Sequence, residues 1–236
     1  MRVSLWATLT LFVLGAGCAH VVDAPPPSAR LPLVEAVLVV GTAPTPFRIG
    51  WVDSSQAIPV LPIDPADVQL DLIGPGARRS LVADPDSAGR FTVDLPIAAG
   101  TEYRLAGTIN GQPVAGATTT PSGFSVVAPT SSPIVLPATP GVAQFVDYRW
   151  ETPGATLVLA DSAFFPPGYS VTRVDRGRLA ILGRAAGMTG PTIQLWALNL
   201  DADRYLFGTP APATNLDGAF GVLGGALARR LEVAWR

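Results

Sequence analysis

The chain has 236 residues, a formal net charge of −2 and 48% hydrophobic residues, with 24 glycines and 24 prolines. A weakly acidic chain lacks the electrostatic footprint of a nucleic-acid-binding protein. All basic residues are arginines and the single histidine, His20, lies close to the N-terminus, which excludes Ser-His-Asp, Cys-His and lysine-dependent catalysis and His/Cys zinc sites from the rest of the chain.

The first eighteen residues combine a positive charge, a short apolar run and a cysteine. Arg2 precedes an apolar run from Leu5 to Leu14, and small residues then lead to Cys18. This run is too short to cross a hydrocarbon layer, which needs about 20 residues, so residues 1–17 are predicted to be a cleavable signal peptide. The stretch Leu-Gly-Ala-Gly-Cys resembles the lipobox of bacterial lipoproteins, and this implies that Cys18 is lipidated and becomes the first residue of the mature chain.

The alternative is an ordinary signal peptide cut after Ala19, which leaves a soluble secreted protein. Cys18 is the only cysteine, and an exported protein has little use for one unpaired thiol, which favours lipidation. Residues 18–32 are rich in proline and small residues and are predicted to form an extended tether. Ala19, rather than an aspartate, follows the cysteine, and the usual Gram-negative sorting pattern then implies an outer-membrane protein, facing the periplasm or the cell surface.

The next part of the chain, residues 33–120, is predicted to be an N-terminal β-sandwich. Apolar residues alternate there in short runs bounded by turn residues, which indicates strands at 34–40, 47–52, 68–73, 90–95, 103–109 and 114–119. Asn110-Gly111 predicts a type I′ hairpin, because both central residues of that turn need a positive φ, and Asp84–Gly89 predicts a longer turn. We therefore expect an all-β antiparallel sandwich of the immunoglobulin or fibronectin kind.

Residues 121–140, rich in proline and hydroxyl side chains, are predicted to be a linker to a C-terminal β-rich domain over residues 141–236. Strands are expected there at 144–150, 156–160, 169–174, 179–183, 192–198 and 231–235. One short helix is predicted over residues 202–207, with Asp201 as its N-cap. Whether the two halves are separate domains is left open.

A family resemblance extends over most of the mature chain. It is carried by GRFTVDLPIAAGTEYRLAGTINGQPVAGATTTP and LNLDADRYLFGTPAPATNLDGAFGVLGG, which contain a Gly-x-Phe strand, a Gly-Thr-x-Tyr-x-Leu strand, a hairpin, a closing proline, a tyrosine-containing helix and an Asn-x-x-Gly-x-Phe-Gly segment. Together with an N-terminal strand after the tether, these features resemble the uncharacterised lipoprotein family called domain of unknown function 4249. The resemblance implies an all-β envelope lipoprotein and no activity.

No catalytic, cofactor or metal site is predicted, and carboxylate chemistry is the only class of catalysis left. Paired carboxylates cleave glycosides when they lie about 5 to 10 Å apart, but nothing in the sequence brings together any two of the glutamates, Glu35, Glu102, Glu151 and Glu232. Asp84–Gly89 fails as a calcium loop, because Ala88 and Leu95 occupy ligand positions. Gly218–Gly225 lacks the spacing of a phosphate loop and is predicted to be a bulge or a place of close backbone packing.

Three functions are weighed on this basis. The leading one is a non-catalytic envelope lipoprotein, held to the membrane by its lipid, that binds or supports an envelope protein or glycan. The second, a carbohydrate-binding module, needs at least two exposed aromatic rings on one face, but core positions are favoured for Trp51, Trp150, Trp196 and Trp235 because most lie in alternating apolar runs. The third, a carboxylate-based hydrolase, needs a cleft with two carboxylates at working distance.

Overall fold

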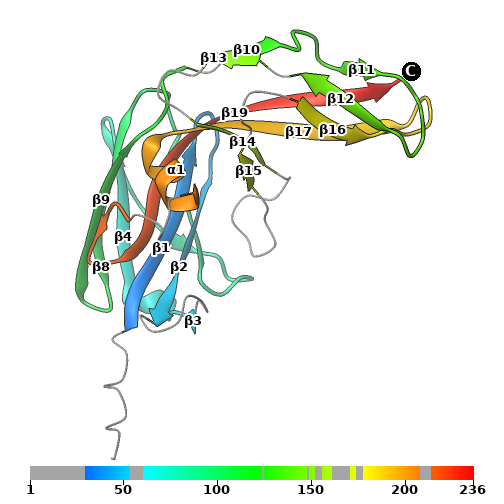
Figure 1. Cartoon of the computed structure of the whole chain (residues 1–236). Coiled ribbons are helices and arrows are strands. Elements are labelled where there is room, and N and C mark those ends of the chain that lie inside the picture. Colours follow the sequence, from blue (N-terminus) through cyan, green and yellow to red (C-terminus); the bar gives the residue numbers. More distant parts are fainter. Residues whose placement is uncertain are drawn as a thin grey trace, which may run out of the picture.

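The structure is a computed structural model that describes residues 30–53, 61–123, 125–147, 149–151, 156–160, 171–173, 178–207 and 214–236. The predicted signal peptide, Cys18, His20 and the tether up to residue 29 lie outside these residues. Figure 1 shows an upright body, where β1 begins at the lower end, and a long arm that leaves the upper end of the body and carries the C-terminus.

Strands dominate the described part of the chain. The body contains β1 (Arg30–Val39), β2 (Thr45–Asp53), β3 (Leu61–Pro62), η1 (Pro65–Asp67), β4 (Val68–Gly74), β5 (Ala77–Ser80), β6 (Val82–Ala83), β7 (Arg90–Val93), β8 (Glu102–Ile109), β9 (Gln112–Thr119), α1 (Leu200–Phe207) and β18 (Leu216–Asp217). The arm contains β10 (Ser125–Ala128), β11 (Ile134–Leu136), β12 (Ala143–Asp147), β13 (Arg149–Glu151), β14 (Thr156–Ala160), β15 (Val171–Arg173), β16 (Arg178–Leu182) and β17 (Thr189–Leu198). The long β19 (Phe220–Trp235) belongs to both.

The body is a sandwich of two sheets, and the predicted all-β sandwich is confirmed. One layer is a sheet in the order β18-β9-β8-β4-β5, and the other is formed by β19, β1, β2, β7 and β6. A continuous apolar core lies between them, with Phe47, Phe91 and Tyr103 among its largest buried side chains. The pairing is antiparallel except where β19 runs parallel to β1 and to β11.

Strand β1 is buried on both faces. Val34, Ala36 and Leu38 point into the sandwich core, whereas Val37 and Val39 belong to a second cluster, with Trp196 of β17, that lies under α1. Strands covered on both sides read as nearly continuous apolar runs, which explains the stretch from residue 33 to residue 40. This second cluster is the junction between the body and the arm.

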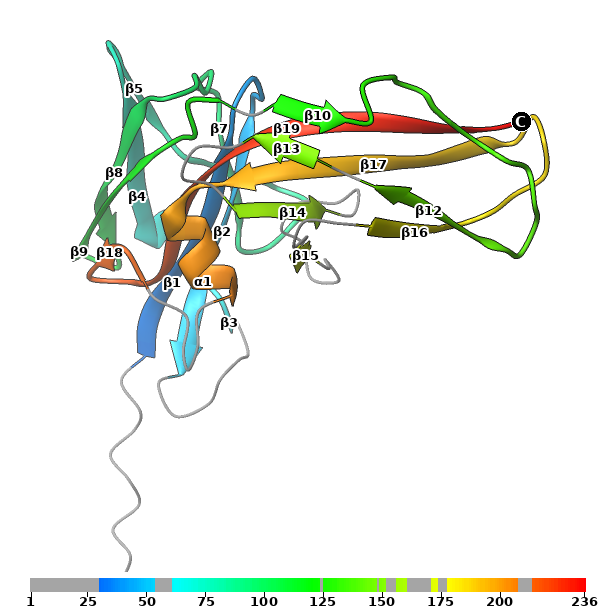
Figure 2. The same cartoon turned by 45° about the horizontal axis from the view of Figure 1, so that its top comes forward.

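The arm continues the same sheet beyond the body. Strand β11 extends this sheet by pairing with the end of β19, and the two-stranded sheets β10-β13 and β12-β16 form a second layer. Figure 2 shows these short strands along β17 and β19. Ile134, Ile181, Leu195 and Leu231 form the small core of the arm with three further buried residues. Residues 121–140, expected to be a linker, therefore contain two short strands of the arm, β10 and β11.

Local turn chemistry appears as expected. Asn110 and Gly111 have φ angles of 49° and 73° and join Ile109 to its partner Gln112, which confirms the type I′ hairpin. The turn at Asp84–Gly89 is also present, closed by the N–H of Asp84 on the oxygen of Arg90 at 2.9 Å. Residues 152–155, between the strands expected at 144–150 and 156–160, lie outside the described residues.

The glycines of β19 permit close backbone packing, as predicted for Gly218–Gly225. Gly221 has a φ of 119°, and a Cβ there would lie 2.0 Å from the backbone oxygen of Val34. A Cβ on Gly224 would lie 2.7 Å from that of Ala202 in α1. No larger residue fits these positions without moving β1 or α1. The glycines therefore set the distances from β19 to β1 and to α1.

Candidate functional site

Asn199 connects three elements at the junction of body and arm. Its amide nitrogen donates to the backbone oxygen of Thr119 on β9 at 2.8 Å, and its amide oxygen accepts from the N–H of Gly225 on β19 at 3.0 Å. The same oxygen accepts from the N–H of Ala202 at 3.1 Å. The predicted cap, Asp201, is therefore wrong: α1 begins one residue before Asp201, and Asn199 satisfies its free N–H group.

Asn215 forms a second bridge of this kind, to residues two positions before the partners of Asn199 on both β9 and β19. Its amide nitrogen donates to the backbone oxygens of Ala117 on β9 (3.1 Å) and Leu223 on β19 (2.8 Å), and its oxygen accepts from the N–H of Leu223 (3.0 Å). The two asparagines thus bond backbone groups along facing edges of β9 and β19, where β9 has no strand partner in the other sheet. They hold the two layers of the body together at this edge.

The hollow beside this edge is polar. It has a volume of about 440 Å³ and is lined by β8, β9 and the start of α1, with Glu102, Thr118 and Asp201 among its residues. The hydroxyl of Thr118 donates to Asp201 at 2.9 Å and accepts from the Asn199 amide at 2.6 Å. Because these groups bond one another, they attach the start of α1 to β9.

Glu35 is the buried carboxylate of the body, with 8% of its surface exposed. Strand register places Arg48 of β2 opposite it, and the two form an ion pair at 3.1 Å. The hydroxyl of Tyr205 in α1 donates to the other carboxylate oxygen. Burial, and after it the charge of Glu35, raises the pKa of Tyr205 far above its ordinary value, so this hydroxyl stays protonated. The cluster attaches α1 to β1.

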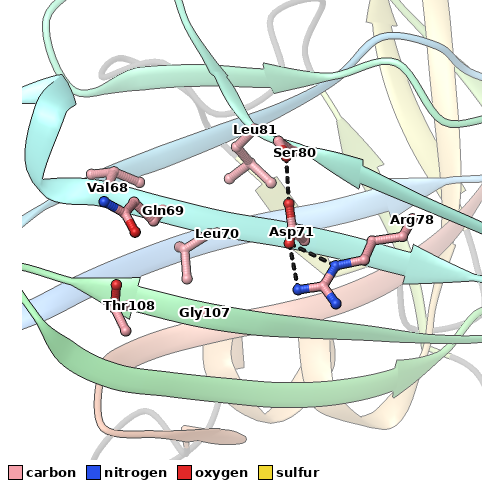
Figure 3. Close-up of a pocket in the computed structure, with 9 residues that line it drawn as sticks. All are labelled: Val68, Gln69, Leu70, Asp71, Arg78, Ser80, Leu81, Gly107 and Thr108. Atoms are coloured by element: carbon pink, nitrogen blue, oxygen red, sulfur yellow. Dashed lines mark hydrogen bonds and ion pairs between the residues drawn. The ribbon is translucent and has the colours of Figure 1, made fainter.

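A second hollow, of about 460 Å³, lies on the face of the sheet formed by β4, β5 and β8. Figure 3 shows its nine lining residues: Val68, Gln69, Leu70, Asp71, Arg78, Ser80, Leu81, Gly107 and Thr108. Its polar groups include the amide of Gln69 and the hydroxyl of Thr108. These polar side chains, with those of Asp71, Arg78 and Ser80, make the hollow a candidate site for a small polar ligand.

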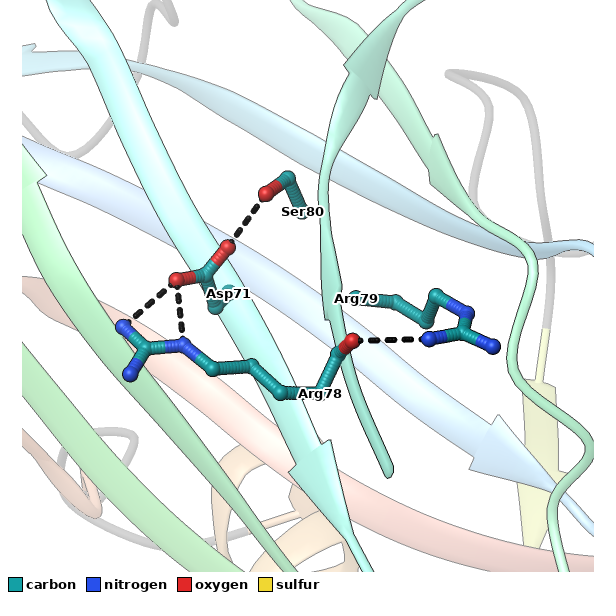
Figure 4. Close-up of polar contacts among 4 residues, drawn as sticks. All are labelled: Asp71, Arg78, Arg79 and Ser80. Carbon is teal, nitrogen blue, oxygen red and sulfur yellow. Dashed lines mark hydrogen bonds and ion pairs between the residues drawn. The ribbon is translucent and has the colours of Figure 1, made fainter.

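Asp71 is the centre of the polar contacts in this hollow (Figure 4). It accepts from the hydroxyl of Ser80, its direct cross-strand partner, at 2.6 Å, and from Nε of Arg78 at 2.7 Å. The hydrogen bond from Ser80, followed by that from Arg78, lowers the pKa of Asp71 below its ordinary value. A carboxylate stabilised in its charged form is a poor base, so this Ser-Asp pair does not activate a nucleophile.

The four glutamates are dispersed in the structure. Glu35 is buried in the cluster described above, Glu102 pairs with Arg104 at 2.7 Å, and Glu151 and Glu232 are exposed on β13 and β19 of the arm. Within the described ranges, no group of three or more His, Cys, Asp and Glu residues is placed to hold a metal ion. None of the helices in the described part of the chain has the length and apolar character needed to cross a membrane.

The tryptophans are mainly core residues, as favoured from the sequence. Trp196 and Trp235 are each 4% exposed, and Trp51 is half-buried against the sandwich core. The side chain of Trp150 lies outside what the structure describes. An aromatic platform for sugars would require exposed rings, so these three residues do not supply one.

Sequence reasoning did not single out Asp71, Arg78, Asn199 or Asn215. Asn199 and Asp201 are both residue types that cap helices, and only the position of the first helical turn distinguishes them. Asp71 and Ser80 become partners through a hairpin register that their separation in the sequence does not reveal.

No protein-family model and no curated protein matches the chain. Solved structures that are similar include the anomalous substructure of titin A168–A169 (12% identity, TM-score 0.26, 87% of this chain and 99% of that chain) and the tandem immunoglobulin domains A164–A165 of titin (8%, 0.26, 88% and 97%). The first two immunoglobulin domains of DIP-gamma are 10% identical at a TM-score of 0.23, over 89% of this chain and 98% of that chain. Such TM-scores establish no shared topology, and the fold class follows from the sheets described above.

Proposed function

We propose that the chain is a non-catalytic lipoprotein of the bacterial envelope, fixed to the outer membrane through lipid on Cys18, that binds or supports another envelope component. The observation that carries this proposal is the only cysteine of the chain, placed directly after a short apolar run and small residues. Two or more acyl chains give stable anchoring where one does not. The resemblance to domain of unknown function 4249 agrees with this assignment.

The geometry of the body suits such an anchor. Strand β1 begins at Arg30, only twelve residues after Cys18, and Figure 1 shows this end of the body on the side away from the arm. An anchor at Cys18 therefore leaves the arm projecting from the body. A projecting arm with exposed apolar side chains is suited to contact with a partner.

The anchor is tested by mass spectrometry of the N-terminal tryptic peptide from protein expressed in a Gram-negative host. Since Arg30 is the first tryptic site after Cys18, lipidation predicts a peptide of residues 18–30 carrying acyl chains, and the Cys18→Ser variant should lack it. An unmodified peptide that begins at His20 would instead identify a soluble secreted protein.

A further inference from the structure

The outer end of the arm brings three chain segments together through backbone hydrogen bonds. The N–H of Gly183 donates to the oxygen of Val142 at 2.9 Å, which joins the loop before β12 to the loop after β16. The N–H of Gly187 donates to the oxygen of Trp235 at 3.2 Å, which adds the end of β19. We call residues 137–142, 183–188 and Arg236 the arm tip. These bonds give its loops a defined shape before any partner binds.

Apolar and basic side chains are exposed together on the arm tip. Val142 and Met188 expose 54% and 51% of their surface, and Phe145, the third residue after Val142, exposes 60%. Arg184 and Arg236 are exposed beside them. The tip loops themselves, residues 137–142 and 183–188, contain no aspartate or glutamate, and the first carboxylate of the flanking strand β12 is Asp147 at its far end. The arm tip therefore offers apolar groups and cations without a carboxylate side chain to neutralise them.

Charge differs between the body and the arm as a whole. The described residues of the body, within 30–120 and 199–226, include seven arginines and twelve carboxylate residues. The described residues of the arm, within 121–198 and 227–236, include seven arginines and three carboxylate residues. A molecule with this asymmetry turns its arm toward an anionic surface and its body away from it, because the potential of each end is summed over its charges.

We propose that the arm tip docks on a phospholipid bilayer with anionic headgroups. Figure 2 shows that the arm ends in loops, and exposed apolar side chains beside arginines match the boundary between anionic headgroups and acyl chains. Val142 and Met188 enter the boundary between headgroups and acyl chains, while Arg184 lies at the phosphate level, where arginines bind by extending their charged heads. The inference rests on the proposed binding role and is independent of lipid on Cys18.

The test uses the chain from Ala19 onward, which keeps every described element and carries no acyl chain. Co-sedimentation is measured with vesicles of phosphatidylglycerol and phosphatidylethanolamine and with vesicles of phosphatidylcholine alone. We expect binding to the anionic vesicles only, weakened by salt. Arg184→Glu should lower the affinity at least about fivefold, the effect of one basic residue near an anionic surface, and Met188→Asp should lower it by a similar factor.

Matched controls lie on the body. Val82 is 63% exposed and Arg79 is exposed on β5, so Val82→Asp and Arg79→Glu make the same changes away from the arm tip and should leave binding unchanged. The proposal is overturned if the protein does not sediment with anionic vesicles, or if tip and body variants behave alike. It is also overturned if Arg184→Glu abolishes a salt-sensitive self-association instead, which would identify a second copy as the occupant. Because this protein has no lipid, none of these outcomes bears on the anchor, which the tryptic peptide tests separately.

Discussion

The body and the arm share one strand, β19, but differ in how they are stabilised. The body core comprises eighteen buried apolar residues between two sheets, whereas the arm core comprises seven among the described residues. Asn199, Asn215 and the Glu35 cluster add polar connections to the body alone. A small core supplies little free energy of folding by itself, so the arm depends on the body through β17 and β19.

The surfaces of the body and the arm also differ. Five of the nine large apolar side chains exposed among the described residues lie in the arm: Val127, Val135, Val142, Phe145 and Met188. The arm is also the more basic region. A small core makes the arm less stable than the body, and its exposed apolar side chains make it better suited to contacts with a partner.

The largest effect is expected at the strand that both regions share. Gly221→Ala places a Cβ against the backbone oxygen of Val34 at a φ of 119°, so the β1–β19 pairing must separate, with a loss of more than about 3 kcal/mol in the free energy of unfolding. Urea unfolding measures this. Gly111→Ala is the control, because it has a positive φ but no atom within 4 Å, and about 1 kcal/mol is expected. Equal losses would contradict the packing role.

Cavities in the two cores should lower the free energy of unfolding by different amounts. Leu72 of the body is fully buried and Leu231 of the arm is 3% exposed. We expect Leu72→Ala to lower the free energy of unfolding by about 3 to 5 kcal/mol and Leu231→Ala by about 2 kcal/mol, because a thin core relaxes more completely around a lost side chain. Hydrogen exchange should show increased opening confined to the arm in the second variant. Exchange that rises equally in the body would show that the regions open as one unit.

Removing an asparagine bridge should have an intermediate effect. Asn215→Ala leaves the N–H of Leu223 and the backbone oxygen of Ala117 without their side-chain partner, which costs about 2 kcal/mol for such partly buried groups. Thermal and urea unfolding measure the loss. Asn110→Gly, in the exposed hairpin turn, is the control and should change stability by only a few tenths of a kcal/mol. A neutral Asn215 variant would mean that water replaces the bridge.

The smallest effect is expected at the surface of the body, from Asp71. Its pKa is lowered in the folded state by Ser80 and Arg78, so the stabilisation is present above the unfolded value of about 3.9 and is lost as the pH falls through the folded value. Arg78 is 64% exposed, which limits the contribution to about 0.5 kcal/mol. Asp71→Asn should therefore be slightly less stable at neutral pH, with the difference vanishing in acid. A constant difference across the pH range would exclude the ion pair as its source.

Local patterns in the sequence predict the strands best where one face of a strand meets water. Residues 103–109 and 114–119 alternate clearly, and β8 and β9 form there around the Asn110-Gly111 hairpin. Prediction is poorer where prolines and short runs obscure the alternation. The tether was expected to extend to residue 32, but β1 begins at Arg30. At Pro32, β1 pairs only with β2, and its pairing with β19 starts at Leu33. A proline, which has no N–H, is tolerated at such an edge position.

The polar groups of the candidate sites were accessible to sequence reasoning only as residue types. Asn199 and Asn215 are sixteen positions apart and meet the same two strands, because β9 and β19 lie along facing edges. Glu35 and Tyr205 are separated by 170 residues. Hydrogen bonds between such distant residues follow from the register of the sheets, and no local spacing encodes them.

The sequence by itself determined the all-β class, the hairpin at Asn110-Gly111 and the need for small residues at Gly218–Gly225, because each depends on φ preferences or on alternation within a few neighbouring residues. The tertiary structure alone decided that β1 pairs in parallel with β19, that Asn199 rather than Asp201 caps α1, and which apolar side chains of the arm stay exposed. These depend on which distant strands become neighbours, and their contacts form only once the chain has closed long loops to bring those strands together.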